Sequence, residues 1–218
     1  MTGFTGIVFD FDGVIADSET IANATLAETL TAIGLPTSYD DSLREYCGHN
    51  WRETERRIVE RLGRPLPSDF REMQRRAARA RFEREMAAVP GVAKFLDRTR
   101  HLKRAIASSS SIEWLAFALE RIGLAHHFEG HLYSAANMDR GKPFPDIYLA
   151  AARGLRLQPE ECMAVEDSPV GASAAVAAGM HVIGLVAGGH IADRAAHADE
   201  LRAVGVHQIA NSFAEIAI

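Results

Sequence analysis

The sequence predicts an α/β protein, a doubly wound parallel sheet with an all-helical domain inserted after its first strand. Short apolar runs that end in polar residues recur along the chain, and helical patterns separate them, as in a sheet built from strand–helix–strand units. The stretch after the first run shows helical patterns but no clear strand pattern. With 218 residues, 47% of them hydrophobic and 24% charged, the chain can bury a sizeable core.

The first predicted strand, residues 7–9, is apolar throughout, as expected of a parallel strand covered on both faces. Further apolar runs predict strands at residues 105–107, 132–134, 163–165, 182–186 and 206–209. Helical patterns predict crossover helices at residues 112–122, 145–154 and 170–178. The last of these has almost no bulky side chains, so we expect it to lie very close to the sheet.

The chain is expected to form two domains. These are a core domain of residues 1–16 and 89–218 and a helical cap domain of residues 17–88. Within the cap, a helical stripe ends before Gly34, and further helices are expected over residues 51–62 and 68–86, the last with Ser68 as its N-cap. An insertion at this point lies beside the strand ends and could act as a lid.

Charge and composition bear on the binding partner and the location. The net charge of −5 gives no indication of nucleic-acid binding, and no segment is long and apolar enough to span a bilayer. The first residues lack a signal-peptide pattern, and Cys47 and Cys162 define neither a disulfide framework nor a metal motif. We therefore expect a cytoplasmic protein, monomeric by default, with a small-molecule partner and no nucleic-acid or membrane partner.

One segment of the cap has an unusual charge. Residues 51–84 contain 11 arginines, 6 acidic residues and no lysine. The simpler interpretation is a solvated helix face. The alternative is that one or two of these arginines face the cleft and hold an anionic group of a substrate.

Polar side chains that could carry chemistry follow four of the predicted strands. They are Asp10 with Asp12, Ser108, Lys142, and Glu166 with Asp167. The carboxyl ends of parallel strands converge on one crevice, so we expect these groups to lie close together. Two carboxylates at one strand end repel each other unless a cation lies between them, and hard oxygen ligands without a His or Cys cluster favour Mg²⁺.

This set of side chains suits phosphoryl transfer. A cation and Lys142 would neutralise a phosphate and shield it from an approaching carboxylate. Asp10 could then attack the phosphorus to form an aspartyl-phosphate, a covalent intermediate that carboxylates can support. Asp12 would protonate the departing oxygen and later deprotonate the attacking water.

The residues resemble the four motifs of the haloacid dehalogenase superfamily. The motifs are Asp10-Phe11-Asp12-Gly13-Val14, the serine after the second strand, Gly141-Lys142-Pro143 and Glu166-Asp167-Ser168. The resemblance covers essentially the whole chain in motif order and spacing, and the insertion is similar to the small cap of the β-phosphoglucomutase-like and sugar-phosphatase branch. It implies a Rossmann-like core, Mg²⁺ as cofactor and a small phosphorylated metabolite as substrate.

The resemblance also implies a role for each motif residue. Asp10 would be the nucleophile and a Mg²⁺ ligand. Asp12 would be the acid and base, and its backbone carbonyl would bind Mg²⁺. Ser108 and the backbone amide of Ser109 would bind phosphoryl oxygens, and Lys142 would bridge the nucleophile and the phosphate.

The fourth motif and the cap complete the implied site. Asp167 would ligate Mg²⁺, and Glu166 would either ligate it or hold a metal-bound water. A cap loop would choose the substrate, with candidate contacts at His49, Asn50, Trp51 and Arg52. For Trp51, packing within the cap is the alternative role. His190 is expected in a surface loop away from the reaction centre.

The implied activity is Mg²⁺-dependent hydrolysis of a small phosphate monoester, such as a sugar or sugar-acid phosphate. A phosphosugar mutase is the nearest alternative. Mutases of this branch carry a threonine and, four residues later, a histidine, where this chain has Ser18 and Ala22. Asp12 argues against a dehalogenase, which lacks this second aspartate. A non-enzymatic phosphoacceptor domain is a remote alternative, because such domains lack a cap.

Overall fold

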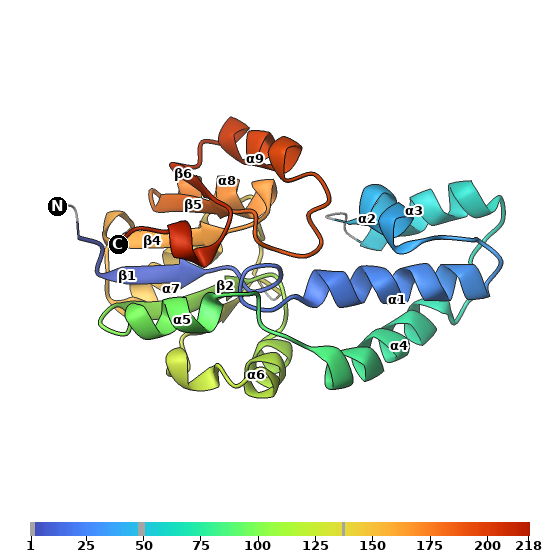
Figure 1. Cartoon of the computed structure of the whole chain (residues 1–218), viewed down its shortest axis with the longest axis horizontal. Helices are drawn as coiled ribbons and strands as arrows, with labels where there is room; N and C mark the ends of the chain where they lie inside the picture. The colour runs from blue at the N-terminus through green and yellow to red at the C-terminus, as the bar shows by residue number, and fades with distance from the viewer. Residues whose placement is uncertain (1–2, 48–50, 137) are drawn as a thin grey trace.

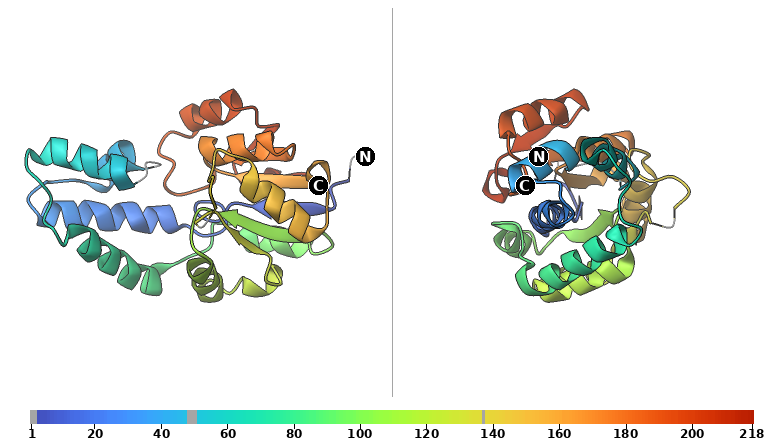
Figure 2. Two further views of the ribbon diagram at one scale, coloured as in Figure 1. Left: turned by 180° about the vertical axis from the view of Figure 1, so that it is seen from behind. Right: turned by 90° about the vertical axis from the view of Figure 1, so that its right-hand side faces the viewer.

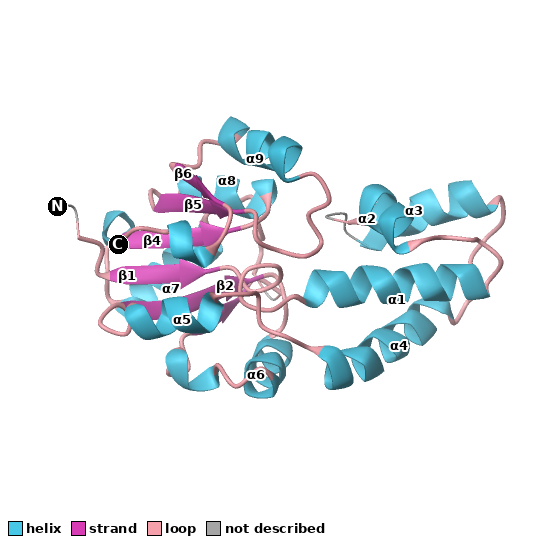
Figure 3. Cartoon of the chain, in the orientation of Figure 1, coloured by secondary structure: helices cyan, strands magenta, loops and turns pink. Residues whose placement is uncertain are grey.

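The computed structural model describes residues 3–47, 51–136 and 138–218. Within these ranges the chain forms a six-stranded sheet of order β3-β2-β1-β4-β5-β6, in which every pair of neighbours is parallel (Figure 3). The strands are β1 (Gly6–Phe9), β2 (Lys103–Ser108), β3 (Leu132–Ser134), β4 (Cys162–Glu166), β5 (His181–Leu185) and β6 (Gln208–Ala210). The strand order reverses between β1 and β4, which is where open α/β sheets bind their ligands.

Helices cover both faces of the sheet. One face carries α5 (Val92–Arg98) and α6 (Ile112–Arg121), and the other carries α7 (Asp146–Leu155), α8 (Pro169–Ala177) and α9 (Arg194–Ala203). Alternate residues of β1 explain how one strand serves both layers, because Ile7 and Phe9 belong to the first core and Val8 to the second. The predicted doubly wound sheet is therefore confirmed.

Helix α8 lies against β4 as its composition predicts. Ala172, Ala174 and Ala175 are fully buried. A Cβ atom at Gly171 would lie 1.7 Å from Glu166 Oε1, so only glycine allows this approach. The small side chains thus bring the helix backbone next to the end of β4.

In the part of the chain that the structure describes, four helices form the cap at one end of the molecule (Figures 1 and 2). They are α1 (Ser18–Ala32), α2 (Tyr39–Tyr46), α3 (Trp51–Leu62) and α4 (Phe70–Glu85). Their inward side chains form a separate apolar cluster of Leu26, Leu30, Leu35, Tyr46, Ile58 and Phe70. No helix among the described residues is long and apolar enough to cross a membrane.

Two details of the cap differ from the prediction. Helix α2 was not predicted, because its eight residues are too few to show a clear apolar period; a capping box between Ser38 and Asp41 starts it. Ser68 was predicted to cap the last cap helix, but the N-cap is Asp69. The reason is a turn in which the Phe70 amide donates to the carbonyl of Pro67, so the helix begins after that turn.

The two chain segments that connect the cap to the sheet domain lie side by side. The Asp17 amide donates to Ala87 O at 3.0 Å, and the Val89 amide donates to Ile15 O at 2.9 Å. A ring contact adds to this junction, since Phe82 of α4 packs edge-on against Trp114 of α6 with 4.8 Å between ring centroids. The cap therefore faces the carboxyl ends of the strands (Figure 1).

Candidate active site

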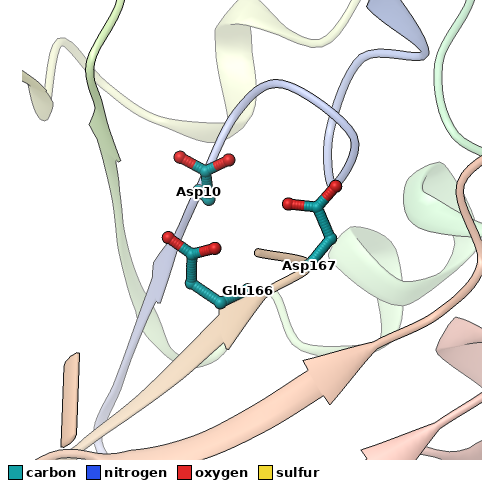
Figure 4. A group of neighbouring side chains, drawn as sticks. All are labelled: Asp10, Glu166 and Asp167. Carbon is teal, nitrogen blue, oxygen red and sulfur yellow. The ribbon is translucent and has the colours of Figure 1, made fainter. Parts of the chain in front are cut away.

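Three buried carboxylates meet where the strand order reverses. Asp10 follows β1, Glu166 ends the neighbouring strand β4, and Asp167 comes next in the chain. Figure 4 shows the three side chains converging from these two strand ends. One carboxylate oxygen from each residue lies within 4.8 Å of the other two. The predicted convergence of the first and fourth motifs is therefore confirmed for these three carboxylates.

Lys142 places a cation against this cluster. Its Nζ donates to Asp10 Oδ1 at 2.6 Å and to Glu166 Oε1 at 2.6 Å, and its side chain is 7% exposed. Burial opposes the charged form, but the two carboxylates outweigh it and hold the pKa of Lys142 above its ordinary value. Lys142 is thus a fixed positive charge beside Asp10.

Glu166 is fully buried, and each of its oxygens has two donors. Besides Lys142, the hydroxyl of Tyr148 donates to Oε1 at 2.6 Å. The amide and hydroxyl of Ser168 both donate to Oε2 at 3.1 Å. Sequence reasoning missed Tyr148, although a tyrosine in the mostly apolar helix after Gly141-Lys142-Pro143 is a signal that could have found it.

The electrostatics of the cluster favour a bound cation. Burial raises the pKa of Asp10 well above its ordinary value, Lys142 opposes this, and the neighbouring carboxylates add to it. Burial also raises the pKa of Asp167. Three carboxylates against one lysine leave excess negative charge that a divalent cation would offset. Hard oxygen donors at this spacing fit Mg²⁺.

Asp12 lies outside the carboxylate cluster and is held by two hydroxyl groups. Ser18 Oγ donates to Asp12 Oδ1 at 2.6 Å, and Ser110 Oγ donates to Oδ2 at 2.8 Å. The chain turns at Gly13, where φ is +85°, immediately after this residue. The carboxylate of Asp12 is therefore oriented apart from that of Asp10, which suits proton transfer rather than metal binding by this carboxylate.

The serines from the end of β2 onward, Ser108 to Ser111, make different contacts. Ser108 is buried, and its Oγ accepts from the Ser110 amide at 3.0 Å. Ser109 is exposed. Ser111 is the N-cap of α6. Sequence reasoning missed Ser110, because nothing in a run of four serines shows which one reaches Asp12.

Glu19 brings a further carboxylate to the cap side of the site, and sequence reasoning missed it. It lies in the first turn of α1, one residue after Ser18. Asn23 Nδ2 donates to Glu19 Oε2 at 3.3 Å, and Ser42 Oγ in turn donates to Asn23 Oδ1 at 3.0 Å. Burial, together with the charge of Asp12, raises the pKa of Glu19 to about 7.

The predicted cap contacts are less well supported. The Trp51 ring stacks on Phe70, with 6.3 Å between centroids, and the Arg71 guanidinium lies 5.5 Å from it, so packing within the cap explains Trp51. Arg52 is exposed. His49 and Asn50 lie outside the described residues.

Most cap arginines contact groups of the cap itself rather than the carboxylate cluster. Five form ion pairs with glutamates of the cap: Arg56, Arg57, Arg79, Arg81 and Arg84. Two more donate to cap oxygens, Arg61 to Tyr46 Oη and Arg64 to Ile33 O. These contacts favour the solvated helix face over the cleft-facing alternative for these seven residues.

His190 does not lie in a surface loop away from the site, so that expectation was wrong. Its side chain is 9% exposed, and its Nε2 lies 3.2 Å from Asp167 Oδ2. The connection from β5 to α9 folds back over the end of β4, and the sequence carries no pattern that shows this. Asp167 outweighs the effect of burial and raises the pKa of His190.

Comparisons with known proteins agree with this geometry. YhcW of Bacillus subtilis, named provisionally as a phosphatase, is 36% identical over 183 residues, which are 81% of each chain. The 6-phosphogluconate phosphatase of Escherichia coli is 25% identical over 191 residues, covering 87% of this chain and 86% of the relative. Beta-phosphoglucomutase of Bacillus subtilis is 27% identical over 207 residues, 82% of each chain.

A solved structure and a family model extend the agreement to the fold. A haloacid dehalogenase-like protein of unknown function from Agrobacterium tumefaciens has a TM-score of 0.88 and 34% identity, covering 97% of this chain and 95% of that one. The family model described as haloacid dehalogenase-like hydrolase matches residues 4–179. With the motif residues at the carboxyl edge of the sheet, these matches show that the chain belongs to the haloacid dehalogenase-like hydrolase family.

Proposed function

We propose that this phosphatase hydrolyses a small sugar phosphate in a Mg²⁺-dependent reaction, through an aspartyl-phosphate on Asp10. The observation that carries the proposal is the position of Lys142, whose Nζ bonds both Asp10 and Glu166 at 2.6 Å. A lysine in this place neutralises a phosphate next to the nucleophile and keeps Glu166 paired. The Asp12 carboxylate, which is oriented apart from that of Asp10, supplies the proton transfer that the reaction needs.

In the first half of the reaction, a carboxylate oxygen of Asp10 attacks phosphorus, and the bond from phosphorus to the substrate oxygen breaks. Asp12 gives its proton to that departing oxygen, so an alcohol leaves and the phosphoryl group stays on Asp10. Lys142, the hydroxyl of Ser108 and the amide of Ser109 hold the phosphoryl oxygens.

In the second half, Asp12 takes a proton from a water molecule as the water oxygen attacks the phosphorus. The bond from phosphorus to Asp10 breaks, inorganic phosphate leaves, and both aspartates return to their starting states. The hydrogen bonds from Ser18 and Ser110 keep the Asp12 carboxylate in one orientation through both steps.

Asp10, Asp167 and the backbone carbonyl of Asp12 would hold Mg²⁺, which when bound neutralises charge between the carboxylates and the phosphate. Glu166 has a different proposed role. Both of its oxygens already accept two donors, so it acts by holding Lys142 and Tyr148 rather than as a ligand. The proposal thus gives Glu166 no direct bond to the cation.

For the leaving group we propose a neutral sugar or polyol. Glu19 lies on the cap side of Asp12, and a carboxylate accepts hydrogen bonds from substrate hydroxyl groups. Seven arginines of residues 51–84 contact groups of the cap instead, which weakens the case for a sugar acid. Relatives named as a fructose-1-phosphate phosphatase and a phosphorylated carbohydrates phosphatase support this class but do not identify the compound.

A phosphosugar mutase is the alternative. Its support is the mutase among the relatives. Against it, Ser18 and Ala22 replace the threonine and histidine of mutases. Mutases also carry a lysine in their last cap helix, and residues 17–88 contain no lysine. A mutase would interconvert sugar phosphates in the presence of a bisphosphate and release little phosphate.

The test is phosphate release from a panel of esters that includes p-nitrophenyl phosphate, glucose 6-phosphate, fructose 1-phosphate and 6-phosphogluconate. We expect release with Mg²⁺ and none with excess EDTA. Chromatography of the products separates hydrolysis from isomerisation. An isomerised sugar phosphate without free phosphate would favour the mutase, and no turnover of any ester would contradict the proposed activity.

A further inference from the structure

Asp167 is held by two histidines that come from one segment of the chain. His190 follows β5, and His197 lies in the first turns of α9. His190 Nε2 lies 3.2 Å from Asp167 Oδ2, and His197 Nε2 lies 2.5 Å from the backbone oxygen of Asp167. A carbonyl and an ionised carboxylate only accept, so each histidine must carry its hydrogen on Nε2. One segment thus fixes both the side chain and the backbone of this residue.

The contact with His190 leaves one oxygen of Asp167 for the site. Oδ2 lies between His190 and the turn at Gly13, where a Cβ atom would come within 1.8 Å of it. Figure 4 shows one carboxylate oxygen of Asp167 directed toward Asp10 and the other directed away. The side chains of both His190 and Asp167 are less than 10% exposed. The carboxylate is therefore confined from one side and open toward the cluster on the other.

The His190 ring packs against Gly13 and Gly188 but has few polar contacts. Its Nδ1 is buried and has no hydrogen-bond partner among the described residues. The Nε2 contact is therefore the polar contact that orients the ring. The segment before it also touches the cap, since a Cβ atom at Gly189 would lie 3.0 Å from Thr20 Oγ1 of α1.

We propose that His190 and His197 are positioning residues for the divalent cation. His190 fixes the outward oxygen of Asp167 and His197 fixes its backbone carbonyl, so the inward oxygen is presented to the cation together with Asp10. The inference rests on the proposed Mg²⁺-dependent function. Partners that orient a metal ligand typically change metal affinity by about 10–100-fold when they are removed.

The test is Mn²⁺ binding to the intact, substrate-free protein, measured from the loss of the free Mn²⁺ signal in electron paramagnetic resonance. We expect His190→Leu to weaken binding about tenfold or more, and His197→Leu to weaken it less, because it leaves the carboxylate contact in place. His190→Gln keeps a donor at similar reach and should bind within about threefold of wild type. His126→Leu, at an exposed histidine of the segment Ala125–His127, is the matched control and should bind like wild type.

Steady-state kinetics with p-nitrophenyl phosphate provide a second readout. The Mg²⁺ concentration for half-maximal rate should rise in His190→Leu, while KM for the ester at saturating Mg²⁺ stays near the wild-type value. A residue that only supports folding would not produce this split. If His190→Leu does not fold in EDTA, His190→Asn carries the test, because its shorter side chain stays polar but does not reach Asp167.

The outcomes separate this inference from the proposed function. If wild type binds Mn²⁺, Asp167→Asn does not, and folded His190→Leu or His190→Asn binds within twofold of wild type, the positioning role is overturned. If Asp167→Asn binds Mn²⁺ as tightly as wild type, the proposed metal site itself is wrong. Tenfold weaker binding with rescue by His190→Gln supports the inference.

Discussion

Asp10 and Asp12 are two residues apart, yet their side chains have different partners, in line with the different tasks that we propose for them. Asp10 contacts Lys142, whereas Asp12 accepts from Ser18 and Ser110. We expect Asp10→Asn to abolish phosphate release. Asp12→Asn should slow both halves of the reaction, by about 10²–10⁴-fold for loss of acid–base help. Initial rates with p-nitrophenyl phosphate check this, and normal activity in Asp10→Asn would refute its assignment as nucleophile.

Glu19 gives a prediction about stability and pH. Its pKa in the folded protein is about 7, above the ordinary 4.5, so the folded state binds the proton more tightly. The free energy of unfolding should therefore fall as the pH rises from about 4.5 to 7. Glu19→Gln removes this loss. Its free energy of unfolding should therefore exceed that of wild type by about 1–3 kcal/mol at pH 8 and by little at pH 4.5. Urea unfolding in EDTA measures both. An equal difference at the two pH values would contradict the account.

We expect Tyr148 to act as a positioning residue for Glu166. Its hydroxyl donates to Glu166 Oε1, which Lys142 also contacts. Tyr148→Phe should lower kcat and cost about 1–2 kcal/mol of stability, because one buried hydrogen bond is lost and no cavity forms. Ser168 offers a comparison, since Ser168→Ala removes a donor from the opposite oxygen of Glu166 and the N-cap of α8 as well. If Tyr148→Phe leaves both quantities unchanged, the hydroxyl has no part in holding Glu166.

Among the elements, α8 is the one whose sequence and position agree most closely. Its glycine and alanines allow contact with β4, and Gly171 has no room for a Cβ atom beside Glu166. Gly171→Ala should lower the free energy of unfolding by about 1–3 kcal/mol through overpacking. It should also reduce activity by moving Glu166. Ser173→Ala on the same helix, at a half-buried position, is the control and should have a small effect. Wild-type stability in Gly171→Ala would show that the helix can shift freely.

The elements also show what the sequence can and cannot predict. All six strands and the convergence of Asp10, Lys142, Glu166 and Asp167 could be predicted, because apolar runs and parallel topology determine them. Helices α2, α5 and α9 were not predicted, since such short helices show no clear apolar period. Tyr148 and Ser110 were missed and His190 was misplaced because their contacts join segments that are distant in sequence, and only the tertiary fold shows such contacts. Glu19 was missed because its burial near Asp12 depends on the same fold.

At the scale of the whole molecule, the proposed function assigns the phosphoryl chemistry to the sheet domain and the surroundings of the leaving group to the cap. The two connecting segments pair through residues 15–17 and 87–89, so the cap meets the sheet domain beside the first motif. Glu19 and Ser18 lie just beyond this junction and reach the site from the cap side. The position of the cap is therefore tied directly to the orientation of Asp12.

The central claim is that Asp10 carries the phosphoryl group, and peptide mass spectrometry tests it most directly. Asp12→Asn, mixed with p-nitrophenyl phosphate and Mg²⁺ and quenched in acid, should accumulate the intermediate, because p-nitrophenolate leaves with little help from an acid whereas water attack without the base is slowed more. We predict a phosphoryl group on the peptide that contains Asp10, and none in Asp10→Asn or after EDTA. A phosphoryl group on another residue, or its absence during turnover, would contradict the account.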